Sequence, residues 1–222
     1  MKENNWFDPF YIQSHLNEEE SNIQKNVRDF CNNELKPTVV ERNRKNEFDQ
    51  SLYPKFGSLG VLGQTVKTHG GSGTSNLAYG LVAYEFEKID SSYRSSISVQ
   101  SSLVIHPINE FGSQEQKDKY LPPLIKGEKI GCFGLTESEA GSDPTSMKTS
   151  FKKTKDGYII NGSKNWITNA PIADIFIIWA IEENKDHKSI KGFIIEKNTE
   201  GLNTSTIENK TSLKISPTGQ II

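Results

Sequence analysis

The chain has few cysteines, no long apolar run and no excess of one charge, and each shortage excludes a class of protein. Its two cysteines, Cys31 and Cys132, lie far apart without metal-ligand spacing, so we expect both to be reduced and buried. No apolar run approaches the roughly 20 residues of a membrane-spanning helix. The formal net charge of −2 gives no general attraction to nucleic acid or to an anionic membrane.

Histidine is also sparse, and its placement argues against a metal site. The four histidines show no ligand pattern: His15, His69, His106 and His187. The polar, acidic N-terminus lacks the apolar segment of a secretory signal and the arginine-rich character of a transit peptide. We therefore expect a cytoplasmic protein with no metal, nucleic-acid or membrane partner.

The apolar pattern changes near residue 130, which predicts two domains. Before this point, helical spacing predicts helices after an N-cap at Asn17, over 52–59, 76–88 and 95–111, and from Ser113 to near Pro122–Pro123. After it, the pattern predicts strands over 130–137, 175–183 and 191–198, with a hairpin at Asp156–Gly157. A last strand begins in 212–222 and is expected to leave an unprotected sheet edge. The prediction is an α+β chain: an all-α domain over residues 1–129, then a small antiparallel β-sandwich or barrel over residues 130–222.

Two stretches of the β region are candidates for binding a ligand. The segment 133–144 leaves a strand for a Gly/Ser/Asp turn, whose backbone N–H groups can face an anion. An ordinary surface loop has the same composition. The segment 165–169 places Trp166 beside small polar residues, so its indole can pack against a planar ring. A core tryptophan is the structural alternative.

A third candidate lies in the helical region. Here an arginine is flanked by serines and preceded by acids: Glu85, Glu87, Arg94, Ser95 and Ser98. An arginine at a helix start suits a carboxylate, because its guanidinium presents five donors in a rigid fork. A surface ion pair is the alternative.

Together these stretches resemble the acyl-CoA dehydrogenase family. The resemblance rests on FGLTExxxGSDPxxM and on the later NWITN. Within the family, the segment 90–137, which contains YRSS, and the opening NWFDPF are most similar to glutaryl-CoA dehydrogenases. The resemblance covers the N-terminal and middle domains of that family. It implies that the C-terminal helical bundle, which carries the glutamate base, is absent from these residues.

The resemblance implies FAD as the cofactor and an acyl-CoA as the substrate. The residues that the resemblance places at FAD are Phe133, Leu135, Thr136, Gly141, Ser142, Trp166, Ile167 and Thr168. It places at the acyl-CoA, chiefly around its distal carboxylate, the residues Glu87, Arg94, Ser95, Ser98 and Ser142. Ser138 stands where many relatives have proline, and we expect it to alter turn rigidity rather than the cofactor.

The implied reaction is flavin-dependent oxidation of an acyl-CoA at its α and β carbons, here the oxidative decarboxylation of glutaryl-CoA to crotonyl-CoA. The resemblance also implies a homotetramer, an electron-transferring flavoprotein as acceptor, and a role in lysine and tryptophan degradation. No acid of the chain matches the family's base, so no catalytic residue is assigned and these residues alone are expected to be inactive. A dehydrogenase for another short-chain acyl-CoA, or a non-catalytic module that retains the fold, are the alternatives.

Overall fold

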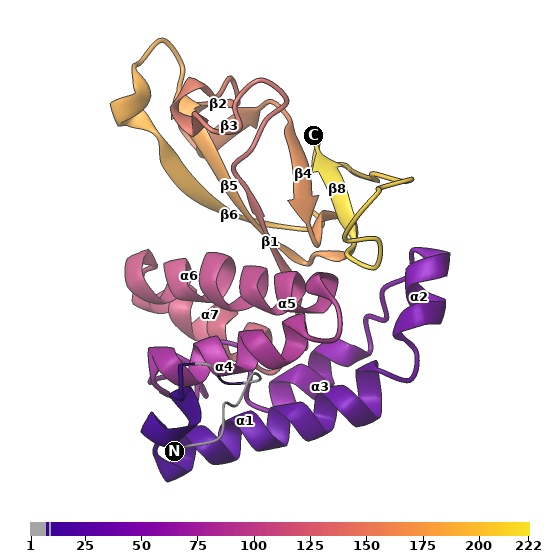
Figure 1. The fold of residues 1–222 in the computed structure, drawn as a ribbon. Coiled ribbons are helices and arrows are strands. Elements are labelled where there is room, and N and C mark those ends of the chain that lie inside the picture. The colour runs from indigo at the N-terminus through magenta and orange to yellow at the C-terminus, as the bar shows by residue number, and fades with distance from the viewer. Residues whose placement is uncertain (1–7, 9) are drawn as a thin grey trace.

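The computed structural model describes Asp8 and residues 10–222, and its N-terminal half is all-helical (Figure 1). The helices α1 to α7 and three short 3-10 or π segments follow one another without any intervening strand. Their bounds are η1 Ile12–His15, α1 Glu18–Phe30, η2 Cys31–Leu35, α2 Val39–Lys45, α3 Leu52–Ser58, α4 Asn76–Glu87, α5 Ser91–Ser98, η3 Val99–Ile105, α6 His106–Phe111 and α7 Gln114–Ile125.

Local capping signals explain where several of these helices begin. The Asn17 side chain accepts a hydrogen bond from the backbone N–H of Glu20, and the Glu20 carboxylate accepts from the N–H of Asn17. Ser113 and Gln116 form the same reciprocal capping box before α7. Ser75 caps α4 by accepting from the N–H of Ala78. These starts agree with the sequence prediction.

Two of the predicted helix boundaries differ from the structure: the start of one helix and the end of another. The helix expected over 95–111 begins at Ser91, because Asp90 caps it by accepting from the N–H of Ser92 at 2.8 Å. The last helix, expected to end near Pro122–Pro123, includes both prolines and ends two residues later, at Ile125. Each proline lacks only its own N–H, and the Pro122 carbonyl still accepts from Lys126.

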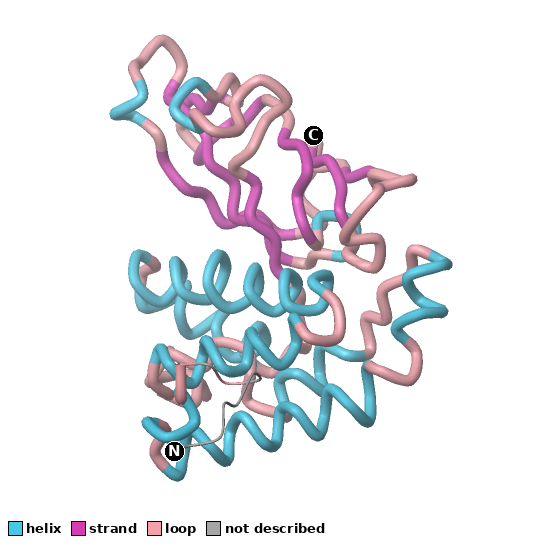
Figure 2. The backbone as a smooth tube through the Cα atoms, in the orientation of Figure 1, coloured by secondary structure: helices cyan, strands magenta, loops and turns pink. Residues whose placement is uncertain are grey.

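The second half forms a small β domain of two sheets (Figure 2). The strands are β1 Gly131–Gly134, β2 Ser150–Thr154, β3 Gly157–Asn161, β4 Lys164–Thr168, β5 Ile175–Glu182, β6 Lys191–Glu196, β7 Thr204–Thr206 and β8 Thr218–Ile221. One sheet has the order β1-β5-β2-β3 with β6 paired to β5, and the other has the order β4-β8-β7. Most pairs are antiparallel, as predicted, but β1 and β2 run parallel to β5, so the first sheet is mixed.

Two details of the β domain differ from the sequence prediction. The β2–β3 hairpin turns at residues 155–156, one position earlier than expected, because Thr154 pairs with Gly157. The final strand, β8, is not an unprotected edge: it pairs with β4 on one side and β7 on the other. The sequence did not indicate β7, which is three exposed residues long.

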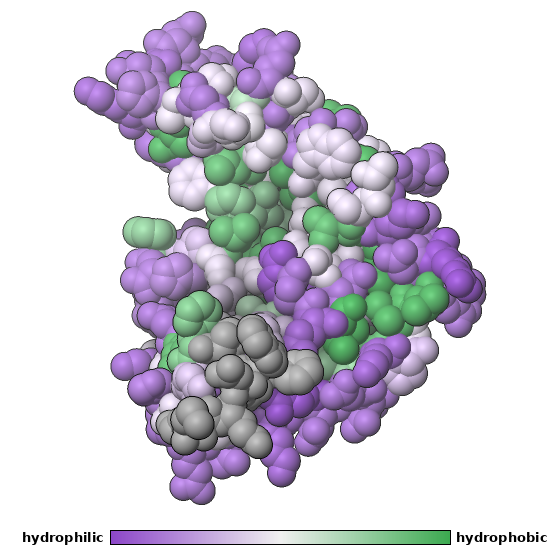
Figure 3. Space-filling view, viewed as in Figure 1, coloured by the Kyte–Doolittle hydropathy of each residue, from purple (hydrophilic) through white to green (hydrophobic). Residues whose placement is uncertain are grey.

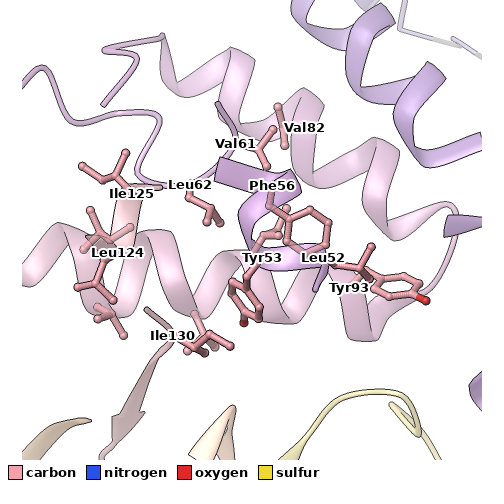
Figure 4. Packing of buried hydrophobic residues seen from close by; sticks show 14 of the residues in the cluster. Leu52, Tyr53, Phe56, Val61, Leu62, Val82, Tyr93, Leu124, Ile125 and Ile130 are labelled. Carbon is pink, nitrogen blue, oxygen red and sulfur yellow. The ribbon is translucent and has the colours of Figure 1, made fainter. Parts of the chain in front are cut away.

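A shared core and a buried glutamine hold the two halves together. The larger hydrophobic cluster extends from the helices to Ile130, just before β1 (Figure 4). It also includes Ile175 and Ile177 of β5. Gln100, fully buried in η3, accepts from the N–H of Gly131 at 2.7 Å. Its amide also donates to the carbonyl oxygens of two residues that precede β1, Leu124 and Lys129. The start of β1 is therefore fixed against the helices.

Both cysteines are free and buried, as predicted. Within the described part of the chain, no helix is long and apolar enough to cross a membrane. Over the same residues, no group of three or more His, Cys, Asp or Glu side chains is arranged to hold a metal ion.

Candidate functional site

The first predicted ligand segment forms a tight turn at the end of β1. Phe133 is half-buried and packs edge-on against Trp179, with ring centroids 6.0 Å apart. Glu137 and Ala140 then close the turn through reciprocal backbone hydrogen bonds of 3.1 and 3.2 Å. The other predicted residues of this segment are half-buried or exposed: Leu135, Thr136, Gly141 and Ser142. They are therefore accessible to a ligand.

The second segment exposes its tryptophan through an irregularity in β4. The pairing of β4 with β8 shifts register between Lys164 and Ile167, and Trp166 lies within this bulge with a φ of 62°. The Trp166 side chain is 58% exposed. A left-handed backbone is uncommon for a bulky residue and costs free energy, so a strained, outward-facing indole indicates a binding surface.

The three residues that follow Trp166 differ in burial and in their contacts. The Ile167 side chain is 4% exposed and packs in the core of the β domain, so Ile167 can reach a ligand on the outer surface only through its backbone. Thr168 is half-buried and pairs with Thr218 of β8. Asn169 donates from its amide to the Gly131 carbonyl, which fixes the end of β4 against β1.

The two segments lie side by side, although the sequence separates them. The N–H of Asn165 donates to the Thr136 carbonyl at 2.9 Å. The Lys164 ammonium donates to the Leu135 carbonyl at 3.0 Å. The fold therefore places Trp166 next to the turn that carries Leu135 and Thr136, and the two segments form one surface.

A buried ion pair joins the segments, and the sequence analysis missed it. Lys164, 1% exposed, and Glu137, 9% exposed, are 2.8 Å apart between Nζ and Oε1. The Glu137 carboxylate also accepts from the backbone N–H groups of Lys148 at 2.7 Å and Thr149 at 3.0 Å. The partners lie 27 residues apart, so no local spacing indicates the pair.

Burial and hydrogen bonding shift the pKa values of both members of this pair. Burial alone would raise the pKa of Glu137, but hydrogen bonds from Lys164, Thr149 and Lys148 outweigh it and lower that pKa to about 2. Burial lowers the pKa of Lys164, and the bond to Glu137 opposes this change. Removal of one partner would leave an unpaired charge in the protein interior.

The predicted carboxylate site lies at the junction of α4 and α5. Arg94 Nε donates to Glu87 at 2.7 Å, and the Ser91 hydroxyl also donates to Glu87. These bonds, first from Ser91 and then from Arg94, lower the pKa of Glu87. Ser95 and Ser98 are half-buried on the same helix. Within the described residues, no hydrogen bond occupies the terminal nitrogens of Arg94, which leaves them free for a ligand.

Glu85 does not belong to this group. Its carboxylate is 2% exposed and accepts from Arg28 at 3.0 Å and from Gln24 at 2.9 Å, both on α1. Glu85 is therefore part of a buried polar network of the helical domain, which is neither the predicted carboxylate site nor the surface ion pair given as its alternative.

The helix α5, which carries Arg94, continues into η3, and η3 packs on the start of β1. Figure 1 shows α5 beneath β1, and η3 packs so closely on β1 that a Cβ atom at Gly131 would lie 2.5 Å from Val104. Figure 3 shows an apolar recess between the β domain and the helices. A planar, largely apolar ring system with polar edges fits the exposed indole and the adjacent turn.

The fold is thus a helical domain followed by a small β domain that carries the two paired segments. The chain matches the family model of the acyl-CoA dehydrogenase N-terminal domain over residues 17–128 and that of the acyl-CoA dehydrogenase middle domain over residues 132–222. The chain therefore belongs to the acyl-CoA dehydrogenase family.

Individual relatives agree with this membership. The short-chain-specific acyl-CoA dehydrogenase of Clostridium acetobutylicum is 38% identical over 93% of this chain and 55% of its own length. A glutaryl-CoA dehydrogenase from Mycobacterium smegmatis, solved with FADH2, superposes with a TM-score of 0.92 at 38% identity, over 96% of this chain and 54% of that one. The butyryl-CoA dehydrogenase of Megasphaera elsdenii gives 0.86 at 37% identity, over 93% and 56%. The chain thus spans about half the length of these relatives.

Proposed function

We propose that this chain supplies the helical and β domains of an FAD-dependent acyl-CoA dehydrogenase that oxidises glutaryl-CoA. The observation that carries the proposal is the pairing of the turn after β1 with the bulge of β4, which presents a strained, exposed Trp166 beside Leu135 and Thr136. We refer below to the full-length protein as a polypeptide that continues past Ile222 to the length of the relatives.

In this proposal each segment has a distinct task. Trp166 packs on the flavin ring, Thr168 lies beside it, and Ile167 contributes its backbone. Leu135 and Thr136 approach the ring from the turn. Phe133, near the end of β1, contributes packing. Gly141 and Ser142, further along the turn, face the pyrophosphate and the thioester. When bound, FAD would supply the acceptor for the hydride that leaves the substrate's β carbon.

The substrate class rests on Arg94. Its Nε is held by Glu87, so its terminal nitrogens are oriented for a bidentate bond to a distal carboxylate. The half-buried Ser95 and Ser98 lie on the same helix to add hydroxyl donors. An acyl chain that ends in a carboxylate, as in glutaryl-CoA, fits this arrangement.

A dehydrogenase for a monocarboxylic short-chain acyl-CoA is the second candidate. It is favoured by the similarity to the short-chain-specific enzyme and to butyryl-CoA dehydrogenase. The response of the two substrates to an Arg94 substitution separates the candidates.

By resemblance, we further propose that the catalytic base lies in a C-terminal helical domain of the full-length protein. That protein would form a homotetramer and pass its electrons to an electron-transferring flavoprotein. Glu87 is not assigned as the base, because Arg94 and Ser91 already engage its carboxylate.

Trp166→Ala is expected to weaken FAD binding by the full-length protein. Stacking of a planar ring on an aromatic side chain contributes about 1–3 kcal/mol, which corresponds to roughly 5- to 150-fold in affinity. Titration of the apoprotein with FAD, followed by flavin fluorescence, measures the change. Phe111→Ala removes another exposed aromatic side chain, 84% exposed on α6, and serves as the control. Unchanged affinity in Trp166→Ala would show that the indole does not contact the flavin.

A further inference from the structure

We propose that the buried Glu137–Lys164 pair is a positioning element that sets the geometry of both cofactor-facing segments. The identity of the ligand, FAD, rests on the proposed function, whereas the contacts of the ion pair are given by the structure. Lys164 belongs to β4 and Glu137 to the turn after β1, so the pair is a buried side-chain connection between the two segments.

Lys164 fixes the orientation of the peptide group that precedes Thr136. Its ammonium holds the Leu135 carbonyl at 3.0 Å. In a trans peptide the carbonyl and the following N–H point in opposite directions. The bond to Lys164 therefore directs the Thr136 N–H away from the Lys164 ammonium. The next carbonyl, that of Thr136, is held in turn by the N–H of Asn165.

Glu137 fixes the other side of the turn. Its carboxylate accepts two backbone N–H groups, from Lys148 and Thr149, in addition to the Lys164 ammonium. The carboxylate thus connects β4 with the residues that lead into β2. Since Gly141 and Ser142 lie between these attachment points, the position of the whole turn depends on this carboxylate.

The same pair supports the bulge that exposes Trp166. Lys164 is the last regularly paired residue before the register shift. Its aliphatic stem fits beside Gly134, where a Cβ atom would lie 3.2 Å from Lys164 Cγ and 2.6 Å from the Ile178 side chain. The lysine side chain is therefore enclosed on one side by β1 and held at its tip by Glu137.

Two buried charges are not the most stabilising way to fill this space. Replacement of a buried ion pair by apolar residues of similar volume is often neutral or favourable for stability. A pair with four directed hydrogen bonds instead specifies orientation. This distinction separates a positioning role from a purely structural one.

The test compares four forms of the full-length protein: wild type, Glu137→Gln, Lys164→Met and the double variant. The measured quantities are the thermal midpoint, the FAD dissociation constant, and hydrogen exchange of residues 135–149 in the apoprotein. Each single variant is expected to lower the thermal midpoint, because it leaves an unbalanced buried group. The double variant is expected to recover most of that midpoint while its FAD dissociation constant stays raised, on the order of 10-fold, the lower end of the effect that outer-shell partners have at metal sites. Exchange of 135–149 is expected to be faster in all three variants.

The matched control removes another Lys–Glu pair attached to the same turn. Glu139 and Lys148 form an ion pair whose side chains are 74% and 76% exposed. The double variant Glu139→Gln/Lys148→Met should leave FAD affinity and exchange unchanged, because the Lys148 backbone N–H still donates to Glu137.

Glu137→Asp provides a milder change, since it keeps the charge but is too short to reach Lys164 and both N–H groups together. It is expected to fold and to bind FAD more weakly. Wild-type affinity and wild-type exchange in Glu137→Asp, or in a folded double variant, would overturn the positioning role. A wild-type protein that binds no FAD would refute the proposed function, and the exchange of 135–149 would still decide whether the pair orders the turn.

Discussion

In the full-length protein, Arg94→Ala is expected to raise KM for glutaryl-CoA strongly and to change KM for butyryl-CoA much less. Loss of one partner of a desolvated charge pair typically costs about 2–5 kcal/mol. With tenfold for each 1.4 kcal/mol, kcat/KM for glutaryl-CoA should fall by a factor of roughly 30 to 4,000. Steady-state kinetics with both substrates measures the difference.

Two further variants make this test specific. Arg94→Lys is expected to recover only part of the loss, because a lysine ammonium cannot form the bidentate fork. Arg44→Ala removes an exposed arginine from α2 and should affect neither substrate. If Arg94→Ala reduced activity equally on glutaryl-CoA and butyryl-CoA, Arg94 would have only a structural role. The proposed preference for glutaryl-CoA would then be refuted.

Residues 1–222 expressed alone are expected to bind FAD weakly or not at all and to show no dehydrogenase turnover. By resemblance, we propose that the C-terminal helical domain completes the flavin site, and no residue of 1–222 is assigned as the base. The β domain also has an open groove of about 710 Å³, with Tyr158 and Ile159 half-exposed at its lining. Exposed apolar surface of this kind favours aggregation, so poor solubility is expected as well.

The measurement is an acyl-CoA assay with an artificial electron acceptor, added FAD and the full-length protein as control. Turnover by residues 1–222 near the rate of the control would show that they contain a competent base. Glu87 would then be the first candidate for that base.

Local signals in the sequence predicted much of the fold. The capping residues Asn17, Ser75 and Ser113 act within one helical turn, so their effect can be read without tertiary structure. The switch from helical to alternating spacing likewise predicted the β domain. The parallel pairing of β1 with β5 was not predictable in this way, because it joins residues more than 40 positions apart.

The candidate site was predictable as two motifs but not as one surface. The strain at Trp166 arises from the register of β4 against β8, which the sequence does not specify locally. Ile167 lies within the same motif, yet the alternation of the strand turns its side chain into the core. The Glu137–Lys164 pair depends entirely on long-range packing, and it became visible only in the structure.

The flavin content of the full-length protein tests the central claim most directly. The measurement is the absorption spectrum of the purified protein after reconstitution with FAD and removal of unbound cofactor. The account predicts a yellow protein whose FAD is bound non-covalently and is released on denaturation. A colourless protein with no flavin spectrum after reconstitution would contradict it.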